Sequence, residues 1–309
     1  MDVNELKKMI EENDVKAVDL KYCGLEGRWY HITFPARRLD YVLAHGVSFD
    51  GSSIPGMRAV ESGDMIIRPD IETAWIDQFT ETPILRMLCS ICDAQTGIGV
   101  KKDPRSVALR AQDYMTQTGI ADQSLWIPEL EFYLFDEAEF YNSKYNSGYM
   151  FSSSQNKDCL PDEFNDSDAI SQQDRKGYHM DTPFDRYFEL RQEVVDYLEE
   201  MKIDVRYHHH EVGLAGQQEI ETELSDFPRI SDSVMIMKDT IRKVSHEYGL
   251  TATFMPKPIY NEPGNGMHFH IQLRKEGKNI FFEKGRYADL SHDALYFIGG
   301  ILKHGASLT

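Results

Sequence analysis

Residues 209–221 read "HHEVGLAGQQEIE" and place two imidazoles and three carboxylates around a middle that contains glycine. In a strand, neighbouring side chains point to opposite faces, so Gln217, Glu219 and Glu221 share one face and Ile220 lies on the other. Carboxylates that are crowded together repel one another and are costly to remove from water. The segment therefore indicates a strand whose polar face holds a positively charged group.

Two further segments, "PELEFYL" (128–134) and "GMHFHIQL" (266–273), repeat this alternation of polar and apolar residues. The residues on their polar faces are Glu129 and Glu131 in the first and His268, His270 and Gln272 in the second. Strands of a doubly wound parallel sheet are apolar on both faces, whereas alternation is typical of antiparallel sheets. We therefore predict a curved antiparallel sheet with one polar face, flanked by helices.

Each polar face alone is typical of the solvent-exposed side of an antiparallel sheet. Glu129 and Glu131, however, lie among Trp126, Ile127 and Phe135, which is a setting typical of a protein interior. Buried carboxylates raise one another's pKa and become protonated unless a cation keeps them ionised. Oxygen-rich ligands with one imidazole favour magnesium or manganese over zinc. The pattern predicts a pair of hard divalent cations.

Other ionisable groups are weaker candidates for ligands. The consecutive histidines 208–210 alternate between faces and cannot all bind one ion, so a hydrogen-bonding role is favoured for each. Glu221 and Glu223 are expected to form a solvated rim of the polar face. Cys89 and Cys92 form a single CxxC motif, which a strand would split between its two faces, and this favours buried thiols over a zinc or redox site.

The amino-acid composition disfavours some classes of binding partner. The chain of 309 residues has 33 basic and 51 acidic residues, a formal charge of -18, and no run of basic residues. This charge disfavours nucleic acid and anionic membrane surfaces as partners. The first residues lack the order of a signal peptide, and no apolar run approaches the roughly 18 residues of a membrane helix. We therefore expect a soluble cytoplasmic protein.

The length and the order of the segments favour a small domain followed by a larger one. Residues 1–100 suggest a small α+β module with an opening helix and a hairpin. Residues 101–309 interleave helices with polar-faced strands. The helices of this part are expected at 103–119, 182–201 and 231–248 and from Ser291 to the end. Residues 137–177 are rich in Asn, Ser, Asp and Gly and are interpreted as a long loop or flap.

Five segments together resemble glutamine synthetase of the type I class, in the order that this family shows. They are "FDGSSIPGM" (49–57), "PELEFYLFD" (128–136), "HHHEVGLAGQQEIE" (208–221), "TATFMPKPIYNEPGNGMHFHIQL" (251–273) and "YFIGGILKHGASL" (296–308). The resemblance implies a β-grasp-like N-terminal domain and a C-terminal catalytic domain. It also implies ATP-dependent ligation of ammonia to the γ-carboxylate of glutamate through γ-glutamyl phosphate, with two Mg²⁺ or Mn²⁺ ions.

The resemblance assigns a role to individual residues. One cation would be bound by Glu131, Glu211 and Glu219, and the second by Glu129 and His268. Asp50 would reach into a neighbouring subunit's site and help to deprotonate ammonium. Binding of glutamate is assigned to Gly264 and Asn265, and binding of nucleotide to Lys257, His270 and Gln272.

The family also implies a homo-oligomer, commonly a dodecamer of two hexameric rings, with active sites between subunits. Family chains continue beyond "KHGASLT", so we expect this chain to lack the family's C-terminal portion and its remaining substrate-binding residues. Two alternatives remain open. The acceptor could be an amine or polyamine instead of ammonia, since Pro263 and Gln272 depart from the family pattern. The chain could also be a non-catalytic relative that regulates a complete partner.

Overall fold

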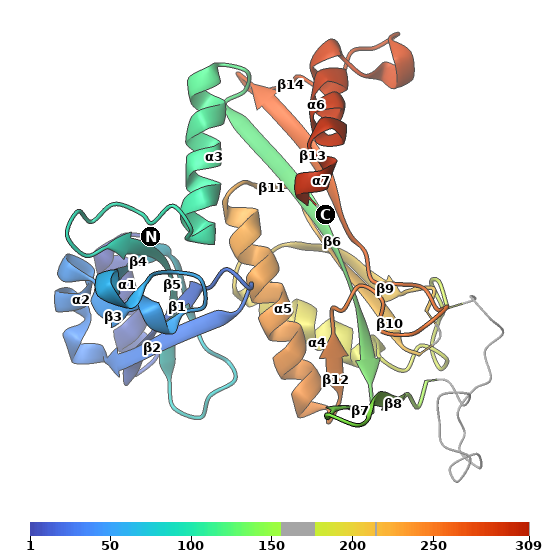
Figure 1. Ribbon diagram of the computed structural model, residues 1–309, viewed down its shortest axis with the longest axis horizontal. Coiled ribbons are helices and arrows are strands. Elements are labelled where there is room, and N and C mark those ends of the chain that lie inside the picture. Colours follow the sequence, from blue (N-terminus) through green and yellow to red (C-terminus); the bar gives the residue numbers. More distant parts are fainter. Residues whose placement is uncertain (156–176, 214, 309) are drawn as a thin grey trace. The chain divides into compact units, whose positions relative to one another are not determined.

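The computed structural model describes residues 1–155, 177–213 and 215–308 (Figure 1). The chain forms two compact units, Met1–Asp122 and Gln123–Thr309, and each unit is built around its own sheet. Helices and strands are mixed in both units, which confirms the predicted α+β class. Among the described residues, no helix combines the length and the apolar character that a membrane crossing needs.

The first unit has a five-stranded sheet in the order β2-β1-β5-β4-β3. Its strands are β1 (Ala17–Cys23), β2 (Trp29–Pro35), β3 (Val47–Asp50), β4 (Asp64–Ile76) and β5 (Ile84–Asp93), and its helices are α1 (Val3–Glu12), α2 (Leu39–His45) and α3 (Pro104–Thr118). The β1-β5 pair is parallel and the other neighbours are antiparallel. The predicted opening helix and hairpin are confirmed, whereas β3 was not predicted.

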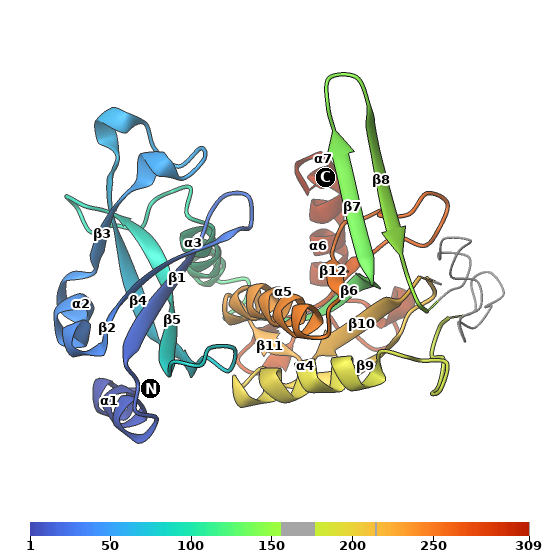
Figure 2. The ribbon, with the colours of Figure 1, turned by 90° about the horizontal axis from the view of Figure 1, so that it is seen from below.

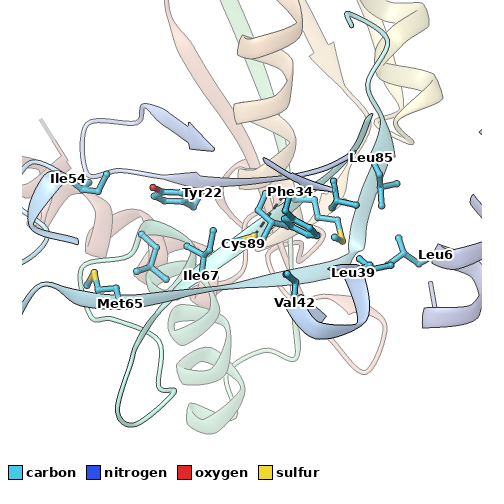
Figure 3. Close-up of a cluster of buried hydrophobic side chains, with 14 of the residues drawn as sticks. Leu6, Tyr22, Phe34, Leu39, Val42, Ile54, Met65, Ile67, Leu85 and Cys89 are labelled. Atoms are coloured by element: carbon cyan, nitrogen blue, oxygen red, sulfur yellow. Dashed lines mark hydrogen bonds between the residues drawn. The ribbon is translucent and has the colours of Figure 1, made fainter. Parts of the chain in front are cut away.

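Helix α1 and the sheet share one hydrophobic core (Figure 3). Asp2 begins α1 with a capping box, in which its side chain accepts from the backbone of Glu5 and the Glu5 side chain accepts from the backbone of Asp2. This cap positions Leu6, which is fully buried in the core. Cys89 and Cys92 are buried in β5, as predicted.

The second unit contains an antiparallel sheet in the order β14-β13-β6-β10-β9, and β11 and β12 also pair with β6. Its strands are β6 (Gln123–Phe135), β9 (Val205–His210), β10 (Gln217–Thr222), β11 (Ser225–Asp226), β12 (Thr251–Thr253), β13 (Met267–Lys275) and β14 (Lys278–Asn279). Every pairing in this sheet is antiparallel, which confirms the prediction from the alternating pattern.

Two helices, α4 (Phe188–Glu200) and α5 (Arg229–Glu247), pack on each other and cover one face of this sheet (Figures 1 and 2). The apolar sides of the strands face these helices, and Leu130, Phe132 and Ile220 are almost fully buried there. The polar side chains therefore occupy the opposite face. Helix α4 begins six residues later than predicted.

The last helices are α6 (His292–Lys303) and α7 (Gly305–Leu308). Ser291 caps α6 as predicted, since its hydroxyl accepts from the backbone of Ala294 at 3.1 Å.

The expectation of an irregular loop after β6 is wrong for residues 137–152. Strands β7 (Glu137–Asn142) and β8 (Ser147–Ser152) form a hairpin there (Figure 2). Phe140 lies opposite Tyr149 in its register, and such cross-strand aromatic pairs stabilise a hairpin whose composition is otherwise typical of loops. The remainder of the predicted flap, 156–176, lies outside the described residues.

Candidate active site

The strand register lines up the ionisable residues in two adjacent rows across the sheet. In the first row, Glu219 of β10 lies between His209 of β9 and Glu131 of β6. In the second row, Glu129 of β6 lies between Glu221 of β10 and His268 of β13. We call the five acids of this region, Glu129, Glu131, Glu211, Glu219 and Glu221, the carboxylate face. Like charges that lie directly opposite each other destabilise a sheet, so this arrangement needs a compensating charge.

Two groups of side chains on this face are close enough to share an ion. Ligand atoms of His209, Glu211 and Glu219 lie within 4.8 Å of one another, and so do those of Glu129, Glu219 and Glu221. Glu219 belongs to both groups. Three of the predicted ligands, Glu129, Glu211 and Glu219, therefore converge.

Crowding and burial shift the pKa values of these acids. Burial, a hydrogen bond with Glu211 and the charges of Glu211 and Glu131 raise the pKa of Glu219 to about 8. Burial also raises the pKa of Glu131, and the charge of Glu211 adds to this effect. A bound divalent cation would reverse these shifts by stabilising the ionised carboxylates. The donor set of several carboxylates with one imidazole fits magnesium or manganese.

Glu131 is held in place by neighbouring backbone and by a buried glutamine. Its Oε2 accepts from the backbone N–H of Gly266 at 2.9 Å and from Nε2 of Gln217 at 2.9 Å. A Cβ added at Gly266 would lie 2.8 Å from Oε1 of Glu131 and 2.7 Å from Nε2 of His268, so a larger residue there would displace these side chains. Gln217 also donates to the carbonyl of Gly264 at 3.0 Å, and its Oε1 accepts from Gly213 at 2.9 Å.

The two histidines of β13 lie beside the acids of β6. His268, which was assigned to the same cation as Glu129, lies opposite Glu129 in the strand register, and its Nε2 is 3.8 Å from Oε1 of Glu131. His270, which was assigned to nucleotide, has its Nε2 2.6 Å from Oε1 of Glu129. Both imidazoles are largely exposed.

The residues assigned to glutamate lie beside the carboxylate face. Gln217 connects this face to Gly264 and to Asn265, whose Oδ1 is 3.3 Å from the Nε2 of Gln217. The Asn265 amide also donates to the carbonyls of Thr253 and Met255 at 3.2 and 3.0 Å. These contacts hold the segment around Gly264 and Asn265 in place and leave its exposed surface free.

The two other residues assigned to nucleotide have partners within the second unit. The ammonium of Lys257 donates to the carbonyl of Glu262. Oε1 of Gln272 accepts from Nε of Arg274 at 2.7 Å. The structure does not bring Lys257, His270 and Gln272 into mutual contact through any described hydrogen bond.

Asp50 ends β3 in the first unit and is exposed. Its Oδ1 accepts from the hydroxyl of Ser52 at 2.7 Å and from the Ser52 backbone at 2.9 Å, and Oδ2 accepts from Ser53 at 3.2 Å. The hydrogen bonds with Ser52 lower the pKa of Asp50. A Cβ at Gly63 would lie 2.5 Å from Oδ1, so glycine there leaves room for the carboxylate. The sequence "DGSS" thus keeps a preoriented, ionised acid at the surface.

The other face of the same sheet also buries charge. Asp185, Arg191, His208 and Gln218 form what we call the arginine face. Arg191 is 1% exposed and donates to both carboxylate oxygens of Asp185, at 3.0 and 2.6 Å, and to Gln218. Its Nε also donates to Nδ1 of His208 at 3.1 Å. Burial and the charge of Arg191 lower the pKa of His208 to about 4, so this imidazole is neutral.

The predicted alternation of the three histidines between the two faces is confirmed, but His209 is a stronger candidate ligand than predicted. His208 and His210 lie on the arginine side, and His210 has Nδ1 2.9 Å from the carbonyl of Gly177. His209 points to the carboxylate face, where its Nε2 is 3.5 Å from Oε2 of Glu219. Because His209 and Glu211 are two residues apart, their shared face could have been read from the sequence.

The prediction that Glu221 is a solvated rim residue is wrong, whereas Glu223 is exposed as predicted. Glu221 is 0% exposed because β10 lies between two strands and Arg206 and Tyr207 cover its side chain. Nη1 of Arg206 is 2.5 Å from its Oε1, and a hydrogen bond with Glu221 raises the pKa of Tyr207 to about 12.

Comparison with known proteins gives consistent results for the whole chain. Residues 14–94 match the family model "glutamine synthetase, beta-Grasp domain", which confirms the expected N-terminal fold, and residues 101–309 match "glutamine synthetase, catalytic domain". A glutamine synthetase of Pseudomonas aeruginosa is 42% identical over 306 residues, covering 97% of this chain and 65% of the relative. The chain thus spans somewhat less than two thirds of the length of such relatives.

Two other relatives show the range of the family. A "3-hydroxylaminophenol mutase" of Cupriavidus pinatubonensis is 39% identical over 308 residues, covering 99% of this chain and 65% of the relative. The cryo-EM structure of Plasmodium falciparum glutamine synthetase superposes with a TM-score of 0.90 at 30% identity, covering 99% of this chain and 60% of that one. From its fold, its carboxylate face and both family models, we conclude that this chain belongs to the glutamine synthetase family.

Proposed function

We propose that this chain provides the cation-binding core of an ATP-dependent ligase that joins ammonia to the γ-carboxylate of glutamate. The convergence of the carboxylate face around Glu219 supports this proposal most directly, because bound cations would compensate its like charges. Divalent cations would supply neutralisation of phosphate oxygens during transfer of the ATP γ-phosphoryl group. The reaction would proceed through γ-glutamyl phosphate.

The residues of the chain would perform complementary tasks. The first cation would be held by Glu131, Glu211 and Glu219, with His209 as a further candidate, and the second by Glu129 with His268 or a neighbouring group. Gln217 and Gly266 would keep Glu131 ionised and oriented. Gly264 and Asn265 would contact glutamate, and Lys257, His270 and Gln272 would contact ATP.

Asp50 would act in a different subunit of a homo-oligomer, which in this family we expect to be a dodecamer of two hexameric rings. Its preoriented carboxylate is suited to accept a proton from ammonium. The domain boundary near residue 100 and the cytoplasmic location stay predictions.

The test is release of ADP by the complete protein that contains these 309 residues, in the presence of glutamate, ATP, Mn²⁺ and ammonium. We expect release that requires every component and that Glu219→Gln reduces by at least about a hundredfold, since a direct cation ligand is lost. The matched control is Glu223→Gln, because Glu223 lies on the same strand segment but is exposed. Release that is the same in Glu219→Gln and wild type would contradict the proposal.

The same assay separates the alternatives. Faster release with methylamine or a polyamine than with ammonium would indicate a γ-glutamyl-amine ligase. Consumption of 3-hydroxylaminophenol without ADP would indicate the activity named for the Cupriavidus relative. Tight binding of Mn²⁺ without any turnover would favour the non-catalytic, regulatory role.

A further inference from the structure

Glu221 combines complete burial with a position inside the group of potential ligands. It occupies the row across β10, β6 and β13, directly opposite Glu129. One of its carboxylate oxygens lies within 4.8 Å of ligand atoms of Glu129 and Glu219. Neither the resemblance nor the roles assigned above include Glu221 among the cation ligands.

The two oxygens of Glu221 have different surroundings. Oε1 accepts from Nη1 of Arg206 at 2.5 Å, and the hydroxyl of Tyr207 lies beside the same carboxylate. Oε2 is buried and, within the described part of the chain, has no hydrogen-bond partner. A buried polar atom without a partner costs about 1–3 kcal/mol, so native proteins rarely leave one unless something else binds it.

We propose that Glu221 binds the second divalent cation directly, together with Glu129 and Glu219. Glu219 would then bridge two cation positions, because it belongs to both groups of converging ligand atoms. The inference rests on the proposed function, since it names a ligand at the same cation centre.

The competing explanation is that Glu221 only balances the charge of Arg206. The two explanations differ in the expected effect of replacing Glu221. If Glu221 only balances the charge of Arg206, replacing Glu221 should leave cation binding unchanged. If Glu221 is a ligand, replacing it should weaken binding of the second cation, whereas removal of Arg206, which competes with the cation for the carboxylate, should leave binding equal or tighter.

The experiment is a titration of the 309-residue chain with Mn²⁺, followed by calorimetry and by the electron paramagnetic resonance signal of free Mn²⁺. Wild type should bind two ions. Glu221→Gln keeps an acceptor for Arg206. It should lower the affinity for the second ion by about tenfold to a hundredfold and leave the affinity for the first ion unchanged. Glu223→Gln should match wild type, and Arg206→Gln should bind the second ion at least as tightly as wild type.

Several outcomes would overturn the inference. Two-site binding by Glu221→Gln with the wild-type affinities would show that Glu221 is not a ligand. If Glu221→Gln fails to fold, Glu221→Asp keeps the charge but withdraws the oxygens, and unchanged binding there would have the same meaning. If the wild-type chain binds one ion and Glu219→Gln loses it, only the second cation position is refuted. If the wild-type chain binds no ion, the cation centre of the proposed function is refuted as well.

Discussion

On the arginine face Arg191 is more deeply buried than most acids of the carboxylate face, yet its charge is matched within the chain. Asp185, Gln218 and His208 satisfy its guanidinium. On the carboxylate face, the neighbours of Glu219 are acids of the same sign, and its pKa is raised to about 8. The buried charge of Arg191 is therefore paired with Asp185, whereas on the carboxylate face Arg206 pairs with Glu221 and like charges still surround Glu219.

The difference indicates which face is structural and which is functional. A buried ion pair that is fully hydrogen-bonded contributes to a defined fold, and its loss exposes an unpaired charge. A group of like charges weakens the fold and persists where it serves a ligand. The arginine face holds α4 to β9 and β10, whereas the carboxylate face is the proposed cation site.

The largest expected effect is on stability and concerns the arginine face. Arg191→Met leaves Asp185 buried without its partner and should lower the free energy of unfolding by about 3–5 kcal/mol. Urea denaturation followed by circular dichroism measures this change. The control is Lys8→Met, which removes an exposed pair with Glu12 and should stay within about 0.5 kcal/mol of wild type. A loss below about 1 kcal/mol for Arg191→Met would show that this face is not needed for the fold.

The two faces should also respond to pH with opposite sign when metal is removed by a chelator. The pKa of Glu219 is raised from 4.5 to about 8, so its folded form binds more protons and stability is lost as pH rises through this window. The pKa of His208 is lowered from 6.5 to about 4, so stability is lost as pH falls through that window.

Variants separate these two contributions, each of which is on the order of 1 kcal/mol after allowance for solvent screening. Glu219→Gln should remove the loss of stability above pH 4.5, and His208→Gln should remove the loss below pH 6.5. Thermal melts across pH 4.5–8 in EDTA measure both. Identical pH profiles for wild type and Glu219→Gln would contradict the description of the carboxylate face as uncompensated.

Much of this organisation could be predicted because strand alternation has a period of two. The pattern around Glu129, Glu131 and Glu219 predicted the sheet, its polar face and the cations without reference to the fold. Burial of Glu221 could not be predicted, because it depends on β9 and on the side chains of Arg206 and Tyr207.

The sequence pattern also could not predict which residues contact each other across neighbouring strands. Alternation assigns a face but not a register, so the position of His268 opposite Glu129 and the side-chain contacts of His270 with Glu129 and of His268 with Glu131 followed only from the structure. The β7-β8 hairpin was missed because its polar composition is typical of loops, while its stability depends on cross-strand aromatic pairs.

The smallest expected effect compares adjacent glutamines that point to opposite faces. Gln217 donates to Glu131 on the carboxylate face, and Gln218 accepts from Arg191 on the arginine face. Gln217→Met should weaken Mn²⁺ binding by about tenfold without changing the number of bound ions, because it removes a group that orients a ligand and not the ligand itself.

Gln218→Met is the matched control, since it makes the same change one residue later. It should lower the unfolding midpoint in urea, because Arg191 loses an acceptor, and leave the Mn²⁺ affinity unchanged. Calorimetric titration and urea denaturation of both variants give a two-by-two comparison. If both glutamines affected Mn²⁺ binding equally, the faces would be coupled through β10, and the division into a structural and a cation-binding face would fail.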